Sequence, residues 1–279
     1  MKTDMKKICL AAFAAIITLT LFVNADQKPL TIYMAGDSTM ADREDTIETP
    51  ERGWGQVLPT FLNDNVIVKN YAKNGRSSRS FIEEGRWSEI VNQLQKGDVV
   101  IIQFGHNDTK QTDSVRHTSI EQYQANLESM IKQAQKKKAK PILCTPITRR
   151  AFSMETGELI NKHGGYVEAA RRVAKATKVP LVDLNQTTSD WLTQVGDSAS
   201  QPYFVYKMEP GEYSKYPEGK TDNTHLRELG ALVVASMFAE AVESQKIKPL
   251  NKYINIPQGN NLTPVYTTVY LPVDDSENQ

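Results

Sequence analysis

Short runs of β-branched and other apolar residues recur along the chain and alternate with longer amphipathic stretches. Five runs are too short for helices and predict strands at Leu30–Ala35, Val66–Tyr71, Val99–Phe104, Pro141–Thr145 and Val179–Leu184. Apolar residues at the spacing of a helix with one buried face characterise the stretches Glu121–Lys138, Gly165–Lys178 and Leu226–Ser244. This alternation predicts βαβ units, and therefore an α/β fold with a mainly parallel sheet that helices cover on both faces.

The first 25 residues have the composition of a secretory signal peptide. Lysines near the N-terminus precede the apolar run Ile8–Val23, and Val23 and Ala25 supply the small residues of a cleavage site. The alternative is a membrane anchor, but this run is shorter than the ~20 residues usually needed to span a bilayer. We expect residues 1–25 to be removed, which gives a secreted or periplasmic mature protein without a membrane anchor.

The remainder of the chain predicts one domain. It contains no internal repeat or long low-complexity linker, so residues 26–271 form a single unit and residues 272–279 an acidic, flexible tail. The formal net charge is zero, with 33 acidic and 33 basic residues, which argues against nucleic-acid binding. Cys144 is the only cysteine outside the leader, so we expect a buried thiol and no intramolecular disulfide. We expect a monomer.

Four short polar motifs follow predicted strands or lie in late loops. They are Gly36-Asp37-Ser38-Thr39-Met40, Asn74-Gly75-Arg76-Ser77-Ser78, Gly105-His106-Asn107-Asp108 and Asp222-Asn223-Thr224-His225. In open α/β sheets, ligands bind beyond the carboxyl ends of the strands, which is where these motifs are expected. The motifs are therefore the candidate functional residues.

The first and last motifs contain the residue types of a serine nucleophile and its base. Ser38 follows the first strand at the expected start of a helix, where it is either a nucleophile or a helix cap. Met40 replaces the second glycine of a Gly-x-Ser-x-Gly elbow, which disfavours an ordinary α/β-hydrolase. Asp222 and His225 are three positions apart and can meet as orienting acid and base. The alternative is that Asp222 caps the following helix beside an exposed histidine.

The two middle motifs contain groups that can stabilise an oxyanion. Gly75 allows a substrate to approach its backbone N–H closely, and Asn107 offers a side-chain amide donor. Both residue types are also common in turns after strands. His106 and Asp108 could be mistaken for metal ligands, but the sequence has no spaced set such as His-Glu-x-x-His. We therefore expect no metal site.

Together the motifs resemble those of the SGNH (GDSL-type) hydrolases. The serine, glycine, asparagine and histidine that name the family match Ser38, Gly75, Asn107 and His225 in the same chain order. Asp222 stands three residues before the histidine, as in the family. The resemblance implies a flavodoxin-like three-layer α/β/α sandwich with a five-stranded sheet. It also implies a catalytic Ser38, Asp222 and His225, with Ser38, Gly75 and Asn107 as oxyanion donors.

Within that family, the sequence is most similar to the rhamnogalacturonan acetylesterases. The similarity lies in residues 35–40, 53–56, 70–78, 103–108 and 221–226, which read AGDSTM, GWGQ, NYAKNGRSS, QFGHND and TDNTHL. It implies a secreted esterase that removes acetyl groups from pectic rhamnogalacturonan through an acyl-enzyme, without a cofactor. The partner would be an acetylated plant cell-wall polysaccharide or oligosaccharide.

The residues that contact the substrate are less constrained. Arg76, Arg79 and Arg86 could bind galacturonate carboxylates, although pairing with neighbouring glutamates is the alternative. His106 and Asp108 are further candidates for substrate binding. Aromatic rings that could pack against sugar rings are available at Tyr203, Tyr206, Tyr213 and Tyr216. The alternative is that they pack in the core or within the loop.

Two other functions remain open from the sequence. One is an SGNH esterase that acts on another acetylated glycan, such as xylan. The other is a non-catalytic glycan-binding protein with the same fold. A binding protein has no need of Ser38, Asp222 and His225 together, which favours an esterase.

Overall fold

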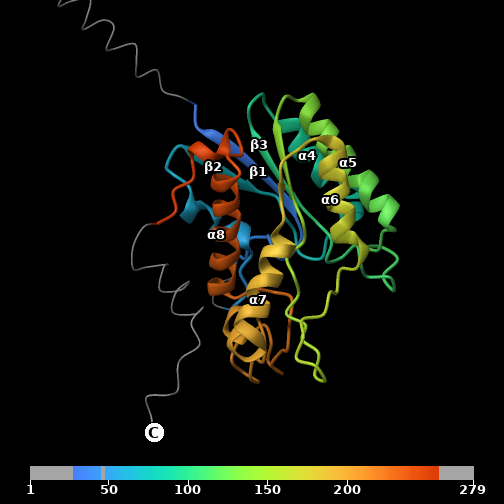
Figure 1. Ribbon diagram of the computed structural model, residues 1–279, viewed down its shortest axis with the longest axis vertical. Coiled ribbons are helices and arrows are strands. Elements are labelled where there is room, and N and C mark those ends of the chain that lie inside the picture. Colours follow the sequence, from blue (N-terminus) through green and yellow to red (C-terminus); the bar gives the residue numbers. More distant parts are fainter. Residues whose placement is uncertain (1–27, 45–47, 258–279) are drawn as a thin grey trace, which may run out of the picture.

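The computed structural model describes residues 28–44 and 48–257, and Figure 1 shows their arrangement. The predicted signal peptide and the predicted acidic tail lie outside the described residues. Within the described part of the chain, no helix has both the length and the apolar character needed to cross a membrane.

The described residues contain one five-stranded sheet in which all strands are parallel, in the order β2-β1-β3-β4-β5. The strands are β1 (Leu30–Gly36), β2 (Val66–Asn70), β3 (Val99–Gln103), β4 (Lys140–Cys144) and β5 (Leu181–Val182). The apolar side chains of β3 are buried on both faces, as expected for the centre of a parallel sheet. The predicted α/β fold is confirmed.

Helices form a layer on each face of the sheet (Figure 1). Tyr33 and Ala35 of β1 face one layer, which consists of α3 (Ser78–Glu83), α4 (Arg86–Gln93), α5 (Ile120–Lys136) and α6 (Gly165–Thr177). Ile32 and Met34 face the other, with α2 (Trp54–Val57), η1 (Leu58–Phe61), α7 (Leu184–Ser200), η2 (Gln201–Tyr203), α8 (Glu228–Ser244) and η3 (Leu250–Lys252). Alternation along β1 therefore supplies two separate apolar cores.

Two of the predicted boundaries that differ from the structure have a clear local cause. The fifth strand stops at Val182, since the Asp183 side chain accepts the N–H of Gln186 and begins α7. The last long helix begins at Glu228 instead of Leu226, because Leu226 pairs with Phe204 in an antiparallel bridge. The predicted burial of Cys144 is confirmed, and burial raises the pKa of its thiol well above the usual range.

The strand order reverses direction between β1 and β3. The connection after β1 leads to β2, whereas the connection after β3 leads to β4 on the opposite side. The neighbouring carboxyl ends of β1 and β3 are held in register, with Gly36 beside Gln103. Ligands bind at such a switch point because the outgoing loops diverge there. Ser38 and Asn107 follow these two strands.

Candidate active site

Ser38 lies in a tight turn after β1, and the helix predicted at this position does not form. The backbone N–H groups of Met40 and Ala41 both donate to the Asp37 carbonyl, at 3.2 and 3.1 Å. The Thr39 carbonyl, which a continuing helix would use internally, instead accepts the N–H of Trp54 at 2.9 Å. The chain therefore makes a single turn here, and Ser38 stays just beyond the carboxyl end of β1.

The Asp37 carboxylate stabilises this turn through hydrogen bonds to Thr39. Its carboxylate is fully buried and accepts the Thr39 N–H at 2.9 Å and the Thr39 hydroxyl at 2.8 Å. Its second oxygen lies 3.2 Å from Nδ1 of His106. Burial raises the pKa of Asp37, but the neighbouring imidazole and the Thr39 donors outweigh it and hold the pKa at about 2. Asp37 is thus an ionised anchor that holds the serine turn.

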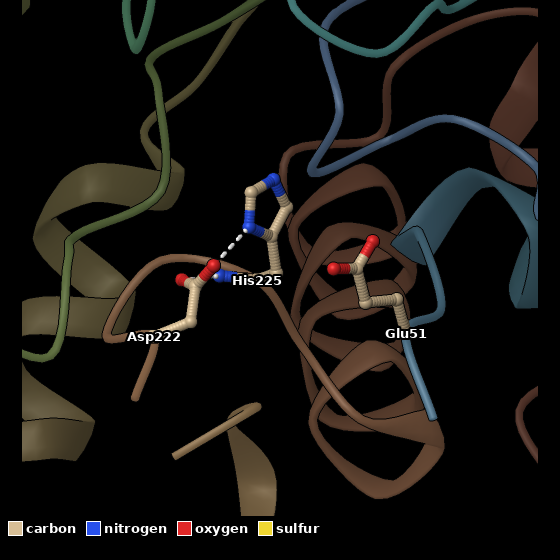
Figure 2. Close-up of side chains that lie close together, drawn as sticks. All are labelled: Glu51, Asp222 and His225. Atoms are coloured by element: carbon tan, nitrogen blue, oxygen red, sulfur yellow. Dashed lines mark hydrogen bonds and ion pairs between the residues drawn. The ribbon is translucent and has the colours of Figure 1, made fainter. Parts of the chain in front are cut away.

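The structure brings Ser38, His225 and Asp222 together. Nε2 of His225 lies 2.8 Å from the Ser38 hydroxyl, and Nδ1 lies 2.7 Å from an Asp222 carboxylate oxygen. The other Asp222 oxygen accepts the backbone N–H groups of Thr224 and His225, at 2.8 and 3.0 Å. Figure 2 shows the carboxylate and the imidazole facing each other in the loop before α8. Asp222 does not cap α8, whose N-cap position is Arg227.

The charge on Asp222 determines which nitrogen of His225 carries the proton. Burial raises the pKa of Asp222, but the hydrogen bond and charge of His225 and the two backbone donors lower it far below its usual range. A carboxylate can only accept, so Nδ1 donates to it and Nε2 presents a lone pair to the Ser38 hydroxyl. The three side chains have the geometry of an activated nucleophile, its base and an orienting acid.

The expected oxyanion donors lie beside this triad. Gly75 has a φ of +76°, a conformation that glycine adopts without strain. Among the described residues, neither its N–H nor that of Ser38 donates to a protein acceptor. The Asn107 side chain is buried and donates one N–H to the carbonyl of Arg76, at 3.0 Å, which leaves its second N–H for another acceptor. Their predicted role remains a prediction.

The predicted substrate contacts occupy two different environments. Arg76 and Arg86 both pair with Glu84, at 2.9 and 2.7 Å, while Arg79 pairs with Glu83 at 2.9 Å. The pairing alternative from the sequence therefore holds for all three arginines. Each nevertheless keeps about a third of its side chain exposed, so the guanidinium groups remain accessible from solvent.

His106 and Asp108 are buried and bond within the protein, which does not favour them as open substrate contacts. His106 supports Asp37, and burial lowers the pKa of His106. Asp108 accepts the Ser78 N–H and hydroxyl at 3.0 and 2.6 Å, and the Thr118 hydroxyl at 3.0 Å. Burial raises the pKa of Asp108 to about 6 despite these donors. His106 thus connects the loop after β3 to the Ser38 turn after β1, and Asp108 connects it to the segment after β2.

The candidate tyrosines mainly pack against the protein. Tyr203 is buried, and the guanidinium of Arg150 lies 4.1 Å from the centre of the Tyr206 ring. The Tyr216 hydroxyl donates to Glu51 at 2.5 Å. The alternative of packing in the core or within the loop therefore accounts for these three rings.

One group of described side chains has donors spaced for a metal ion: Glu51, Asp222 and His225, within 4.8 Å of one another (Figure 2). The ammonium of Lys220, however, lies 2.9 Å from Glu51 and 3.0 Å from Asp222. Both nitrogens of His225 already face protein partners, Asp222 and Ser38. The donor set thus fits a lysine-bridged network better than a metal centre, because the lysine supplies the positive charge between the carboxylates.

Sequence reasoning did not single out Arg43, Glu51 or Lys220, although all three border the triad. Arg43 and Glu51 are buried and joined at 3.0 Å, and Arg43 also donates to the Ser38 carbonyl at 2.9 Å. In the sequence these residues stand among other charged and polar residues, a setting that usually indicates a solvated surface. No local pattern marks them.

Comparisons with known proteins identify the family of the chain. A model of the GDSL-like Lipase/Acylhydrolase family matches residues 34–231. The chain is 36% identical to rhamnogalacturonan acetylesterase RhgT of Bacillus subtilis, over 84% of this chain and 97% of that protein. It is 33% identical to a second Bacillus subtilis protein, "Probable rhamnogalacturonan acetylesterase YesY", over 76% of this chain and 92% of that one.

A solved structure shares the fold at similar coverage of this chain. The X-ray crystal structure of the Bacillus subtilis protein YXIM matches with a TM-score of 0.67 and 27% identity. The match covers 79% of this chain but 58% of that one, so the other protein is considerably longer.

Proposed function

Because the chain belongs to the GDSL-like lipase/acylhydrolase (SGNH) family, we propose that it removes O-acetyl groups from pectic rhamnogalacturonan. The family makes it an acylhydrolase. The two Bacillus subtilis relatives, which match over most of their length, carry the choice of substrate. The observation that carries the chemistry is the continuous contact from the Ser38 hydroxyl through His225 to Asp222.

The proposed reaction follows the positions of these atoms. Oγ of Ser38 attacks the acetyl carbonyl carbon, and its proton passes to Nε2 of His225. Asp222 holds the ring in place and stabilises the imidazolium that forms. The carbonyl oxygen becomes an oxyanion, which accepts hydrogen bonds from the backbone N–H groups of Ser38 and Gly75 and from the amide of Asn107.

The intermediate then collapses with release of the sugar. The bond between the acetyl carbon and the sugar oxygen breaks, and His225 returns its proton to that oxygen. Water attacks the acetyl-Ser38 ester, again losing a proton to His225. Release of acetate restores the Ser38 hydroxyl, so the cycle consumes one water per acetyl group and uses no cofactor.

The test is acetate release from acetylated rhamnogalacturonan by wild type and by Ser38→Ala. Loss of the nucleophile lowers kcat by a factor on the order of 10⁴ or more, while the melting temperature stays close to wild type. Acetylated xylan is the comparison substrate. Faster release from xylan contradicts the proposed substrate, whereas equal, near-zero turnover of p-nitrophenyl acetate by both proteins supports the glycan-binding alternative.

We also propose that the protein acts outside the cytoplasm. The support is the signal-peptide pattern in residues 1–25. N-terminal sequencing of the protein recovered from the periplasm or the medium tests this, with Asp26 as the expected first residue. An intact Met1 in the cell pellet contradicts it.

A further inference from the structure

Arg43 connects the nucleophile turn to the segment that contains Gly75. Its side chain is almost fully buried. One terminal nitrogen donates to the Ser38 carbonyl at 2.9 Å, and the other donates to the side-chain carbonyl of Asn74. Its Nε donates to Glu51 at 3.0 Å. A single guanidinium therefore spans two of the segments that must meet at the reacting carbonyl, and its planar fork fixes their separation.

Glu51 connects Arg43 to the acid of the triad. One of its oxygens accepts from Arg43, and the other accepts from the Tyr216 hydroxyl at 2.5 Å and from Lys220 at 2.9 Å. Lys220 then reaches Asp222 at 3.0 Å, on the same oxygen that accepts from Nδ1 of His225. Figure 2 shows the Glu51 carboxylate on the side of His225 opposite to Asp222.

The charges in this chain of contacts alternate in sign. Burial raises the pKa of Glu51, but the charge of His225 and the surrounding donors hold it at about 2. Burial lowers the pKa of Lys220, but its bonds to Glu51 and Asp222 raise it well above the usual range. Lys220 thus remains cationic, and Glu51 and Asp222 remain anionic. Arg43 adds a second cation, because a guanidinium is not deprotonated in proteins. The four charges compensate one another, which a buried carboxylate requires.

We propose that Glu51 is a positioning residue that couples the nucleophile turn and the oxyanion segment, through Arg43, to the triad acid, through Lys220. The inference rests on the proposed acyl-enzyme chemistry. Glu51 touches neither the substrate nor the reacting atoms in this arrangement. Its position matters because Ser38, Gly75 and Asp222 come from separate loops that no cross-link holds together. Reaction rates fall steeply when such groups shift by as little as ~1 Å.

The primary test is the hydrolysis of p-nitrophenyl acetate by Glu51→Gln and Lys220→Met. Glu51→Gln keeps the shape of the side chain but removes its charge, so kcat falls about 100-fold while KM changes far less. Lys220→Met removes one charge-assisted bond to Asp222, and kcat falls about tenfold. Lys220→Arg recovers most of this loss. Lys207→Met is the matched control, because Lys207 is an exposed lysine in the same loop region, and its kcat stays at the wild-type value.

A spectroscopic measurement separates positioning from stability. The Nδ1 proton of His225, bonded to Asp222, gives a far-downfield ¹H NMR signal in wild type. The signal broadens or disappears in Glu51→Gln and Lys220→Met, although circular dichroism shows both variants folded. Wild-type kcat and an unchanged signal in both folded variants overturn the proposal. If Glu51→Gln does not fold, Lys220→Met and its arginine rescue decide the question.

The same experiment distinguishes this proposal from the proposed function. Turnover of p-nitrophenyl acetate without release of acetate from rhamnogalacturonan contradicts the proposed substrate. The kcat values of the Glu51 and Lys220 variants with p-nitrophenyl acetate still test the positioning role of Glu51. Absence of turnover with either ester contradicts the esterase chemistry. In that case the NMR signal alone decides whether Glu51 holds Asp222 and His225 together.

Discussion

Two arginine–glutamate pairs near the site have almost the same length and very different surroundings. Nε of Arg43 lies 3.0 Å from Glu51, and Nε of Arg79 lies 2.9 Å from Glu83. The side chains of the first pair are 4% and 6% exposed, whereas those of the second are 37% and 58% exposed. Length alone therefore says little about what an ion pair does.

The difference in burial determines what each pair contributes. Water screens Arg79 and Glu83, and holding two long side chains in one geometry offsets most of the attraction. Arg43 and Glu51 have lost water and depend on each other and on their neighbours for compensation. The exposed Arg79–Glu83 pair can open at little cost to bind a ligand. The buried Arg43–Glu51 pair cannot open without leaving a buried charge, so it is suited to hold loops in place.

The most direct test of this difference between the two pairs is the substitution Arg43→Met. The substitution leaves Glu51 buried with one cation fewer and removes the donor to the Ser38 carbonyl. We expect a loss of about 3–5 kcal/mol in the free energy of unfolding, measured by urea denaturation at neutral pH. Arg79→Met is the matched control. If the losses in free energy of unfolding for the two variants differ by less than about 1 kcal/mol, burial does not distinguish the pairs.

The second prediction concerns the stability of the folded protein at acidic pH. Glu51 has a pKa of about 2 in the folded protein and an ordinary value of 4.5. Its contribution to stability is therefore complete above pH 4.5 and is lost as the pH falls from 4.5 towards 2. In that window the wild-type free energy of unfolding should fall more steeply than that of Glu51→Gln, by up to about 1.4 kcal/mol per pH unit.

The control for this prediction is Glu84→Gln, at the exposed carboxylate between Arg76 and Arg86. Burial slightly raises the pKa of Glu84, and the hydrogen bonds from Arg86 and Arg76 lower it overall. Because this group is exposed, its effect should shrink when salt is added. If the free energy of unfolding changes with pH at the same slope in wild type and in Glu51→Gln, at both low and high salt, the proposed difference between the two regions is wrong.

The same contrast explains what the sequence could and could not predict. Buried strands such as Val99–Gln103 are local apolar runs, so their position follows from the pattern. Ser38 and His225 lie in motifs whose residue types indicate their chemistry. Glu51 and Lys220 are 169 positions apart and meet only in the folded chain, so no window of sequence contains their relationship. The absence of a helix after Ser38 has a similar origin, because the Thr39 carbonyl accepts the N–H of Trp54 instead of an N–H within a helix.

The exposed arginines give a third and smaller prediction. Arg76 pairs with Glu84 next to Gly75, and about a third of its side chain is open to solvent. If it exchanges Glu84 for a galacturonate carboxylate, Arg76→Ala raises KM for acetylated rhamnogalacturonan about three- to tenfold, as expected for one charge-assisted hydrogen bond. KM for p-nitrophenyl acetate, which has no carboxylate, rises much less. Equal changes for the two substrates would contradict a role in recognising the polymer.

The smallest effect is expected for the Arg79–Glu83 pair itself. Arg79 also donates to the carbonyls of Ser114 and His117, at 3.2 and 3.4 Å, so a single substitution mixes several losses. A double-mutant cycle with Arg79→Gln and Glu83→Gln cancels those terms and isolates the coupling between the two charges. We expect a coupling free energy of no more than about 0.5 kcal/mol, which decreases with added salt. A coupling as large as that between Arg43 and Glu51 would mean that distance, and not burial, sets the strength of both pairs.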